Sequence, residues 1–371
     1  MPQKKFDIDV SKIESSEVCK PGDLILAELE RKNISQKELA DAIGKSTPVV
    51  NDLIKGKRKI TVPIACLLGA VFDSAPEEWL NIQNLYDIQE SNADEDLRKR
   101  TQRIKNWNAF KDAINVRQLK KRLSLKCDLD GCIESTLLDT GTHSVDELYN
   151  FAESKIAYFK KSDKFQTSPA NLLTWIVVVR HKSNEQQLVH KFNSNNRQEL
   201  INKINSILYK NIRTEKRIKE ILNEYGIKFI VEDKLEKMPV DGYSFWQGTN
   251  PTIAMTKRYK RLDNFAFTLM HELGHIFLHL INDRNNDYID DTKPDEEGSK
   301  EKEANSFATK CLSKGVDLDN LFAKWKNPYA AKNFLKAISN ELEINSSIVA
   351  GQYQHYCKIY SVCRDLITDI K

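Results

Sequence analysis

The amino-acid sequence predicts a mainly α-helical protein, and three observations support this fold class. The N-terminal part contains short segments with recognisable helix start and stop signals. The middle part, from Leu97 to about Lys210, carries apolar residues in a largely helical pattern. Two further amphipathic helices follow in the C-terminal part. With 371 residues, the chain is long enough for two or three domains.

Three short helices are predicted near the N-terminus. The first covers Gly22 to Lys32, and the second covers Ser35 to Gly44. Ser35 is a natural N-cap with Glu38 three residues later, which is the capping-box pattern, and the final glycine is a stop signal. The third helix covers Thr47 to Ile54 and has a proline near its start. A capped helix, a tight turn and a second short helix form the helix-turn-helix layout.

Basic residues follow the third helix. Lys55, Lys57, Arg58 and Lys59 cluster at its C-terminal end. In a helix-turn-helix unit, the second helix presents its N-terminal residues to base edges, while nearby lysines and arginines hold phosphates. We therefore predict DNA binding for this part of the chain. The alternative is an ordinary small helical bundle that makes protein contacts.

The segment from Lys20 to Gln89 resembles the HigA-like antitoxins of the Xre type. The likeness rests on the opening P-G-D-L-I, the core S-Q-x-x-L-A and the ending W-L-N-x-Q-x-x-Y-D. It implies a homodimer that binds the promoter of a toxin operon, and a domain core that includes Trp79 and Tyr86. It also implies a DNA-facing set made of Gln36, Ser46, Thr47, Val49 and Asn51, with Lys55, Lys57 and Arg58 on the phosphate backbone.

The middle of the chain offers helices but no evident chemistry. The polar, acidic segment from Ser91 to Asp96 is predicted to be a linker. Between Arg98 and Lys126 there are eleven Lys/Arg residues and one acidic residue, a pattern typical of a solvated helix face. The segment from Leu172 to Val179 is apolar without a clear period, so a buried strand and a helix both remain open. The histidines of this region, His143, His181 and His190, have no partners at a useful spacing.

The C-terminal part contains the motif H-E-x-x-H, formed by His271, Glu272 and His275. On a helix, this spacing places both imidazoles on one face, where they can bind one Zn²⁺, with Glu272 as general base for a metal-bound water. The apolar stripe of this helix is centred on Leu273, and the histidines point away from it. Gly274 lies between the ligand positions, where another segment could approach closely. The alternative is a core helix that happens to carry two histidines.

A third ligand is expected, because a catalytic zinc usually has three protein ligands and one open position. The segment from Ser299 to Leu312 is predicted to be a second amphipathic helix, on which Glu301 faces inward and Glu303 points towards solvent. We predict Glu301 as the ligand and keep Glu303 as the fallback. Asn305, one turn after Glu301, is placed to hydrogen-bond a ligand. The alternative for Glu301 is a first-turn carboxylate stabilised by the helix dipole.

The two stretches HELGHIFLHL and EKEANSFA resemble the ImmA/IrrE family of zinc metallopeptidases, which are gluzincin-like enzymes. The resemblance runs from near Asn211 onward and implies strands at Tyr225 to Val231 and at Thr252 to Arg258. The predicted fold class is therefore mainly α with a small α+β peptidase domain. One departure is the end of the second helix, Cys311-Leu-Ser-Lys-Gly, where the family usually has a Leu-Leu-Met-Pro-like end. We expect the strand near Thr252 to Met255 to pair with an extended substrate.

We divide the chain into a helix-turn-helix domain at residues 1–90, a helical connecting region at 91–210 and a zinc metallopeptidase domain at 211–371. The composition, with 40% hydrophobic and 30% charged residues, is that of an ordinary globular protein. No apolar run approaches the roughly 20 residues of a membrane helix, and the N-terminus lacks a secretory signal. Seven scattered cysteines do not suggest a disulfide framework. We therefore expect a cytoplasmic protein with no membrane partner.

Two functional hypotheses follow. The leading one is a DNA-binding transcriptional regulator that carries a zinc-dependent endopeptidase, whose substrate by family resemblance is a protein partner such as a repressor or a cognate toxin–antitoxin protein. The alternative is an antitoxin and autorepressor of a toxin–antitoxin operon, in which the metallopeptidase domain is a sensor or inactive. A metallohydrolase that acts on something other than peptides is a third option.

Overall fold

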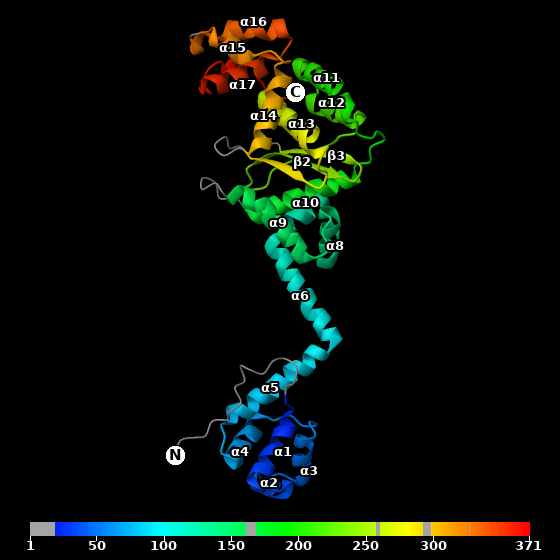
Figure 1. Ribbon diagram of the computed structural model, residues 1–371, viewed down its shortest axis with the longest axis vertical. Helices are drawn as coiled ribbons and strands as arrows, with labels where there is room; N and C mark the ends of the chain where they lie inside the picture. Colours follow the sequence, from blue (N-terminus) through cyan, green and yellow to red (C-terminus); the bar gives the residue numbers. More distant parts are fainter. Residues whose placement is uncertain (1–18, 161–167, 257–259, 292–297, 326) are drawn as a thin grey trace. The chain divides into compact units, whose positions relative to one another are not determined.

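Figure 1 shows the computed structural model of the chain, which describes residues 19–160, 168–256, 260–291, 298–325 and 327–371. The chain forms two compact units, and the boundary between them in the sequence falls between Asn106 and Trp107. Helices account for most of the described residues, and the second unit contains a four-stranded sheet. The predicted class, mainly α with a small α+β domain, is confirmed. None of the described helices is both long and apolar enough to cross a membrane.

The first unit is a bundle of short helices. Its elements are α1 (Pro21–Lys32), α2 (Gln36–Ala42), α3 (Thr47–Ile54), α4 (Val62–Phe72), α5 (Pro76–Ala93) and the start of α6 (Glu95–Ala113). The predicted capping box is present, because the Glu38 amide donates to Ser35 Oγ and the Ser35 amide donates to the Glu38 carboxylate. Helices α1 and α3 pack closely at Gly22, where a β-carbon would lie 1.9 Å from the carbonyl oxygen of Ile54.

The core of the first unit contains one of the two aromatic residues expected there. Trp79 is fully buried, and its ring packs against Phe72 at a centroid distance of 5.5 Å. Tyr86, in contrast, is only half-buried, and its hydroxyl donates to the carboxylate of Glu90 on the same helix. The expectation that Tyr86 belongs to this core is therefore wrong, because its position on α5 leaves the ring at the edge of the bundle.

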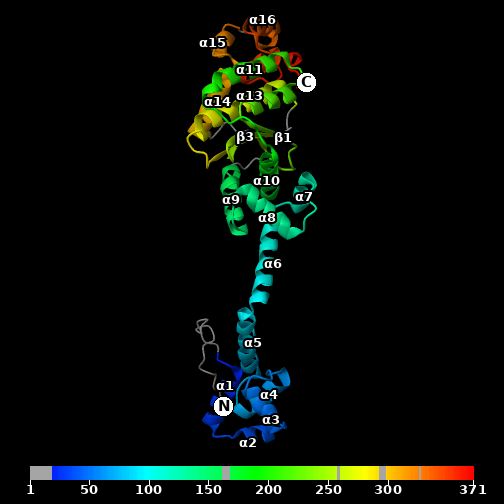
Figure 2. The same cartoon turned by 90° about the vertical axis from the view of Figure 1, so that its right-hand side faces the viewer.

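The second unit combines many helices with one sheet (Figure 2). Its helices after α6 are α7 (Val116–Leu123), α8 (Leu129–Thr140), α9 (Val145–Lys160), α10 (Pro169–Glu185), α11 (Arg197–Lys210), α12 (Thr214–Glu224), α13 (Leu262–Gly274), α14 (Ser299–Leu312), α15 (Leu318–Ala323), α16 (Lys332–Leu342) and α17 (Ser346–Cys357). Its shorter segments are the 3₁₀ turns η2 (Ser194–Asn196), η4 (Pro328–Ala330) and η5 (Arg364–Leu366), and the π-helix η3 (His275–Leu280). Its strands are β1 (Lys228–Glu232), β2 (Val240–Gln247), β3 (Asn250–Thr256) and β4 (Asp287–Asp291).

The strand order of the sheet is β1-β3-β2-β4. Strand β3 pairs in parallel with β1 and antiparallel with β2, and β2 pairs antiparallel with β4. Both edges of β3 are therefore already used by neighbouring strands. The expectation that the segment from Thr252 to Met255 pairs with a substrate is wrong, because an interior strand has no free backbone groups to offer. The strand at the edge of the sheet is β4, which lies in the sequence between the two predicted zinc-binding helices.

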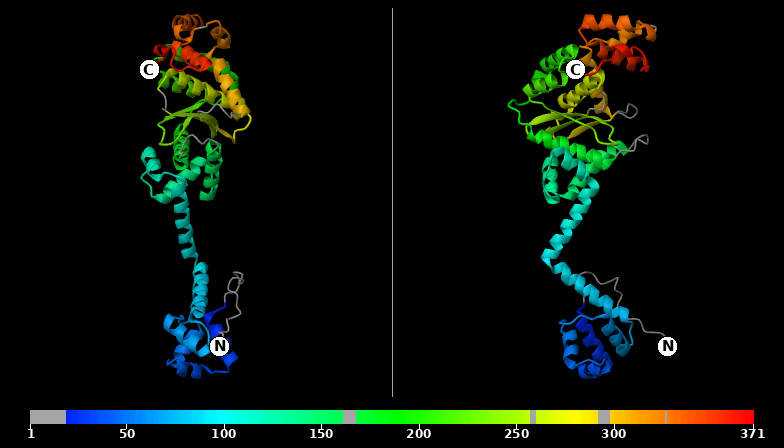
Figure 3. Two further views of the ribbon diagram at one scale, coloured as in Figure 1. Left: turned by 90° about the vertical axis from the view of Figure 1, so that its left-hand side faces the viewer. Right: turned by 180° about the vertical axis from the view of Figure 1, so that it is seen from behind.

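Helices cover both faces of this sheet, with α13 on one face and α10 on the other (Figures 1 and 3). The apolar run from Leu172 to Val179 is the middle of α10. It lacks a clear period because both sides of the helix are buried. Trp175 and Ile176 pack on the sheet against Tyr243, while neighbouring apolar residues of α10 pack into the helices of the connecting region. A helix that is apolar all round is a buried helix.

Helix α10 links the predicted connecting region to the sheet. The guanidinium of Arg180 on α10 donates to the Tyr243 hydroxyl on β2 and to Asp287 on β4. His181, for which the sequence offered no partner, lies with its Nδ1 2.7 Å from Oδ2 of Asp139, 42 residues earlier. Most of residues 91–210 thus shares one compact unit with residues 211–371. The ranges 1–90, 91–210 and 211–371 remain proposed segments of the sequence.

Candidate metal centre

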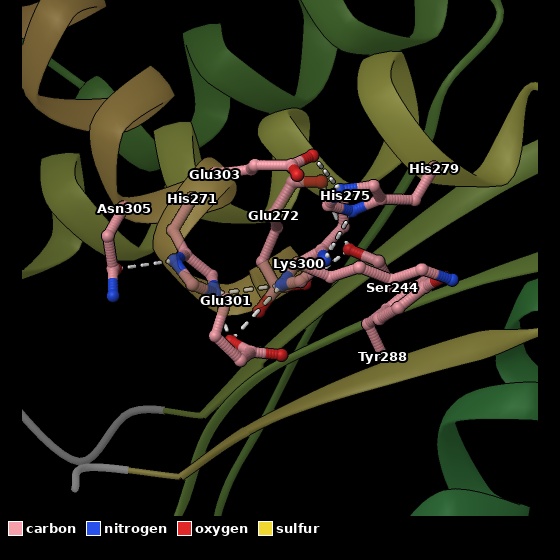
Figure 4. Close-up of polar contacts among 10 residues, drawn as sticks. All are labelled: Ser244, His271, Glu272, His275, His279, Tyr288, Lys300, Glu301, Glu303 and Asn305. Atoms are coloured by element: carbon pink, nitrogen blue, oxygen red, sulfur yellow. Dashed lines mark hydrogen bonds and ion pairs between the residues drawn. The ribbon is translucent and has the colours of Figure 1, made fainter. Parts of the chain in front are cut away.

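The H-E-x-x-H motif lies at the end of α13, where this helix continues into the π-helical segment η3 (Figure 4). The opposite side of the helix packs into the largest apolar core, with Leu273 and Ile276 fully buried. His271, Glu272 and His275 are also buried, with 1%, 0% and 0% of their surface exposed. Three polar side chains buried at one place require polar partners or an ion.

The two motif histidines and Glu301 converge on one point. Nε2 of His271 lies 2.9 Å from Nε2 of His275. Oε2 of Glu301, on α14, lies 3.2 Å from Nε2 of His271 and 3.5 Å from Nε2 of His275. Among the described residues, these three form a group of acidic and imidazole side chains with metal-ligand geometry. The structure thus brings together the three residues that the sequence predicted as ligands.

The donor set fits Zn²⁺. A triangle with these three sides has a circumradius of about 1.9 Å, close to the zinc–nitrogen and zinc–oxygen distances of about 2.0–2.2 Å. Asn305 Oδ1 lies 2.9 Å from Nδ1 of His271. Because a carbonyl oxygen only accepts, this contact places the hydrogen of His271 on Nδ1 and leaves the Nε2 lone pair for a metal. Two nitrogens and one carboxylate leave a fourth position open, as in catalytic zinc sites.

The electrostatics of the site keep two of its donors, His275 and Glu301, in the forms that bind a metal. Burial, which disfavours a charged imidazole, lowers the pKa of His275 to about 4. Burial alone would raise the pKa of Glu301, but the two neighbouring imidazoles, His271 and His275, outweigh this effect and hold that pKa well below its usual range. At neutral pH the site therefore presents a neutral imidazole at His275 and a carboxylate at Glu301, which are the forms that bind a metal.

Glu272 is held by the sheet rather than by its own helix. The hydroxyl of Ser244, on β2, donates to the Glu272 carboxylate and lies 3.1 Å from the Glu272 carbonyl oxygen. At Gly242, where the register of β2 against β4 shifts, an added β-carbon would lie 2.0 Å from Oε1 of Glu272. A bulge and a residue without a side chain thus make room for the carboxylate.

Helix α14 approaches α13 closely at Gly274. A β-carbon on Gly274 would lie 3.1 Å from Cα of Ala304 and 3.2 Å from the ring of Phe307. The sequence placed Gly274 where another segment could come near, and the segment that does so carries Glu301 and Asn305. The glycine therefore sets the spacing between the two helices that supply the donor atoms.

Glu303, the fallback ligand, lies outside the group of donor atoms. Its side chain is 58% exposed, and its Oε2 lies 3.1 Å from Nε2 of His279. His279 is itself buried next to His275 in η3. The ring of Tyr288, on β4, stacks on His275 at a centroid distance of 4.5 Å, and the Tyr288 hydroxyl accepts from Lys300 at 2.7 Å.

The predicted DNA-facing residues lie on and around α2 and α3 of the first unit. Ser46, Thr47, Lys55, Lys57 and Arg58 are exposed, and Gln36 and Asn51 are half-buried. Val49 is half-buried and packs against the core of the bundle, so only part of its side chain is available to a ligand. The exposed side chains at the start of α3 and the basic residues after its end have the arrangement that a helix-turn-helix unit requires.

Two families match this chain. Residues 25–80 match the helix-turn-helix family, and residues 222–324 match the IrrE N-terminal-like domain, a peptidase family. The second match includes the H-E-x-x-H motif and Glu301. The chain therefore combines a DNA-binding regulator domain with a domain of a peptidase family, as the sequence motifs predicted.

Several relatives match the first unit. The HTH-type transcriptional regulator YddM of Escherichia coli is 35% identical over 72 residues, which are 19% of this chain and 77% of that protein. Antitoxin HigA-1 of Vibrio cholerae is 40% identical over 68 residues, which are 18% of this chain and 64% of the antitoxin, so the match spans less than two thirds of it. The structure of Pseudomonas aeruginosa antitoxin HigA with the higBA promoter shares 33% identity, covers 21% of this chain and 85% of that one, and gives a TM-score of 0.20. Through its first unit, the chain belongs to the HTH-type transcriptional regulators.

Sequence reasoning missed the residues that surround the donors. Ser244 and Gly242 lie about 30 positions before Glu272, and strand pairing alone brings them to it. Tyr288 carries no local signal that connects it with the donors. His279 carried a visible signal, because it follows His275 at the same four-residue spacing that separates His275 from His271.

Proposed function

We propose that the chain is a DNA-binding regulator whose second unit is a zinc-dependent endopeptidase that cleaves a protein partner such as a repressor. The observation that carries this proposal is the convergence of His271, His275 and Glu301 next to a buried glutamate that is not one of the donors. Those three residues would hold the zinc. A purely structural zinc usually has four protein ligands and no need of a carboxylate beside them.

Zinc held at this site would polarise the scissile carbonyl and lower the pKa of a coordinated water. Glu272 accepts a proton from the attacking water, which is the role of the glutamate in H-E-x-x-H. Ser244 orients the Glu272 carboxylate through its hydrogen bond. The buried surroundings exclude bulk water and strengthen the charge interactions of the site.

The substrate in this proposal is an extended protein segment that pairs with the edge strand β4. This strand stands at one end of the strand order and carries Tyr288, whose ring stacks on His275. An edge strand offers unpaired backbone groups to an extended peptide, so it can align a scissile bond without demanding a particular sequence.

The test is incubation of the zinc-loaded chain with purified proteins encoded next to its gene, followed by mass spectrometry of the products. We expect a few discrete cleavage products from one of these proteins. Glu272→Gln should retain zinc and lose cleavage by at least about a hundredfold, because a general base typically contributes 10²–10⁴. Cleavage by Glu272→Gln at the wild-type rate would contradict the mechanism.

A second function is favoured by the likeness of the first unit to antitoxin HigA-1. In it, the chain is an antitoxin and autorepressor, and the metal centre is a sensor without peptidase activity. Both proposals include a homodimer that binds promoter DNA, and both place the chain in the cytoplasm beside that DNA. Zinc binding without cleavage of any neighbouring gene product, together with repression of its own promoter, would favour the second function.

A further inference from the structure

We propose that His279 and Glu303 are positioning residues that hold His275 in the tautomer and orientation required for metal binding. Nδ1 of His275 lies 3.1 Å from Nδ1 of His279, and Nε2 of His279 lies 3.1 Å from Oε2 of Glu303 (Figure 4). These contacts form a chain of hydrogen bonds from the surface of α14 to the ligand. The inference rests on the proposed zinc site and adds two residues that act behind it.

Which atom donates in each of these hydrogen bonds follows from the contact between His279 and Glu303. A carboxylate only accepts, so Nε2 of His279 carries the hydrogen that it shares with Glu303. Nδ1 of a neutral His279 is then a bare acceptor. The hydrogen between the two Nδ1 atoms must therefore belong to His275, which leaves Nε2 of His275 as a lone pair.

The hydrogen on Nδ1 of His275 matches the hydrogen on Nδ1 of His271, which is donated to Asn305. Each ligand histidine donates its Nδ1 hydrogen to an acceptor, and each presents a bare Nε2 to the same point. Two lone pairs that face each other at 2.9 Å repel, and a cation between them removes the repulsion. The two acceptors thus prepare the pair of imidazoles for a metal.

Burial makes the contact with His279 costly to lose. His275 is fully buried and His279 is 6% exposed, so an unpaired Nδ1 hydrogen on His275 would have little access to water. The π-helical segment η3 brings the two rings to a centroid distance of 5.2 Å. Such segments are rare and are frequently found at functional sites.

The ring of Tyr288 packs against both imidazoles. It stacks on His275 at an interplanar angle of 11° and lies against His279 at a centroid distance of 5.3 Å. The Tyr288 hydroxyl is tied to Lys300 on α14, the helix that also carries Glu303. The two histidines are therefore held from the strand side and from the helix side.

The competing explanation is that His279 is only a well-packed core residue. In that case its replacement lowers the stability of the fold and leaves the affinity for zinc unchanged. The two explanations also differ in what a glutamine should do. The glutamine side chain can accept from His275 through its oxygen and donate to Glu303 through its nitrogen, whereas leucine fills similar space without either group.

The experiment measures the zinc affinity of the full chain by competition with a chelator, together with the unfolding temperature of the metal-free protein. We expect His279→Leu to weaken zinc binding by about 10- to 100-fold, and His279→Gln to restore it to within a few-fold of wild type. Glu303→Ala should weaken it by roughly two- to tenfold, since water can replace an exposed acceptor. Lys302→Ala, an exposed neighbour on the same helix, is the matched control and should bind as wild type.

Wild-type affinity in His279→Leu, whatever its unfolding temperature, would overturn the inference and leave the zinc site intact. Equal weakening by leucine and glutamine would also overturn it, because the hydrogen bonds would then be irrelevant. A wild-type chain that binds no zinc would instead remove the proposed function on which the inference rests. Zinc affinity is measured without any cleavage assay, so a failure of this inference can be distinguished from a failure of the proposed function.

Discussion

Gly242 lies directly against the carboxylate of Glu272, and a β-carbon at Gly242 would lie 2.0 Å from Oε1 of that carboxylate. The strand β2 therefore sets the position of the proposed general base by having no side chain at this point. The three heavy atoms nearest to such a β-carbon all belong to Glu272, so a substitution at Gly242 acts first on the base.

We predict that Gly242→Ala retains zinc and loses cleavage. The methyl group must displace the Glu272 carboxylate, and a misplaced base should lower the rate by about 10² or more. Zinc content and the rate of substrate cleavage are measured on the same preparation. Gly298→Ala is the control, because a β-carbon there would have no heavy atom of the described residues within 4 Å, its chain neighbours aside. Full activity in Gly242→Ala would show that Glu272 is not confined as the structure indicates.

Asn305→Ala should weaken zinc binding by about 10- to 100-fold, because His271 loses the acceptor that keeps its hydrogen on Nδ1. Asn305→Asp keeps an acceptor oxygen at this position and should bind zinc nearly as wild type does. Chelator competition measures both variants. Equal affinity in wild type and Asn305→Ala would mean that the contact has no influence on the metal.

The stability of the metal-free protein should fall as the pH falls from about 6.5 to about 4. The pKa of His275 is about 4 in the fold and 6.5 in the unfolded chain, so protons in this window bind the unfolded chain more strongly. Above pH 6.5 the His275 imidazole is neutral in both the folded and the unfolded chain, so it does not lower the free energy of unfolding. The loss is on the order of 3 kcal/mol in the free energy of unfolding.

Urea unfolding of the metal-free protein at a series of pH values measures this loss. His275→Gln has no titrating group at the position and should show a flatter profile between pH 6.5 and 4. Glu301, whose pKa is also held down, should add a further loss at lower pH. If the free energy of unfolding had the same pH dependence in wild type and variant, His275 would not be a buried imidazole that is neutral in the fold.

We predict that the first unit makes two kinds of contact with DNA, namely contacts to phosphates and contacts to bases. Lys57→Ala should weaken binding to the chain's own promoter and to a scrambled duplex alike, and reduce the salt dependence by about one unit of slope. Asn51→Ala should cost about 1–3 kcal/mol on the promoter and little on the scrambled duplex. Fluorescence anisotropy at several salt concentrations measures both. If Asn51→Ala weakened binding to both duplexes equally, Asn51 would contact the DNA phosphates and not the bases.

Local signals in the sequence predicted the helices and the donor atoms. The capping box at Ser35, the four-residue spacing of His271 and His275, and the inward face of Glu301 depend on residues within one or two helical turns. Such short-range patterns are readable without a fold. The same is true of Gly274, whose place between the histidines marked a close approach.

Long-range pairing explains what the sequence did not predict. Strand β2 and edge strand β4 lack a distinctive pattern of their own, and β3 was taken as accessible because its neighbours were unknown. Ser244 reaches Glu272 only through the register of β2 in the sheet. Tyr86 was expected in the core from its place in a motif, yet its position on α5 leaves the ring only half-buried. Side chains joined by tertiary pairing have no local signature.

Zinc content of the purified full-length chain tests the central claim most directly. Wild type should hold about one zinc per chain, and His271→Ala and Glu301→Ala should hold almost none after dialysis. Glu303→Ala, at the position outside the donor group, should keep the wild-type stoichiometry. A wild-type chain without zinc after reconstitution, or full zinc retention in both ligand variants, would contradict the assignment of the metal centre.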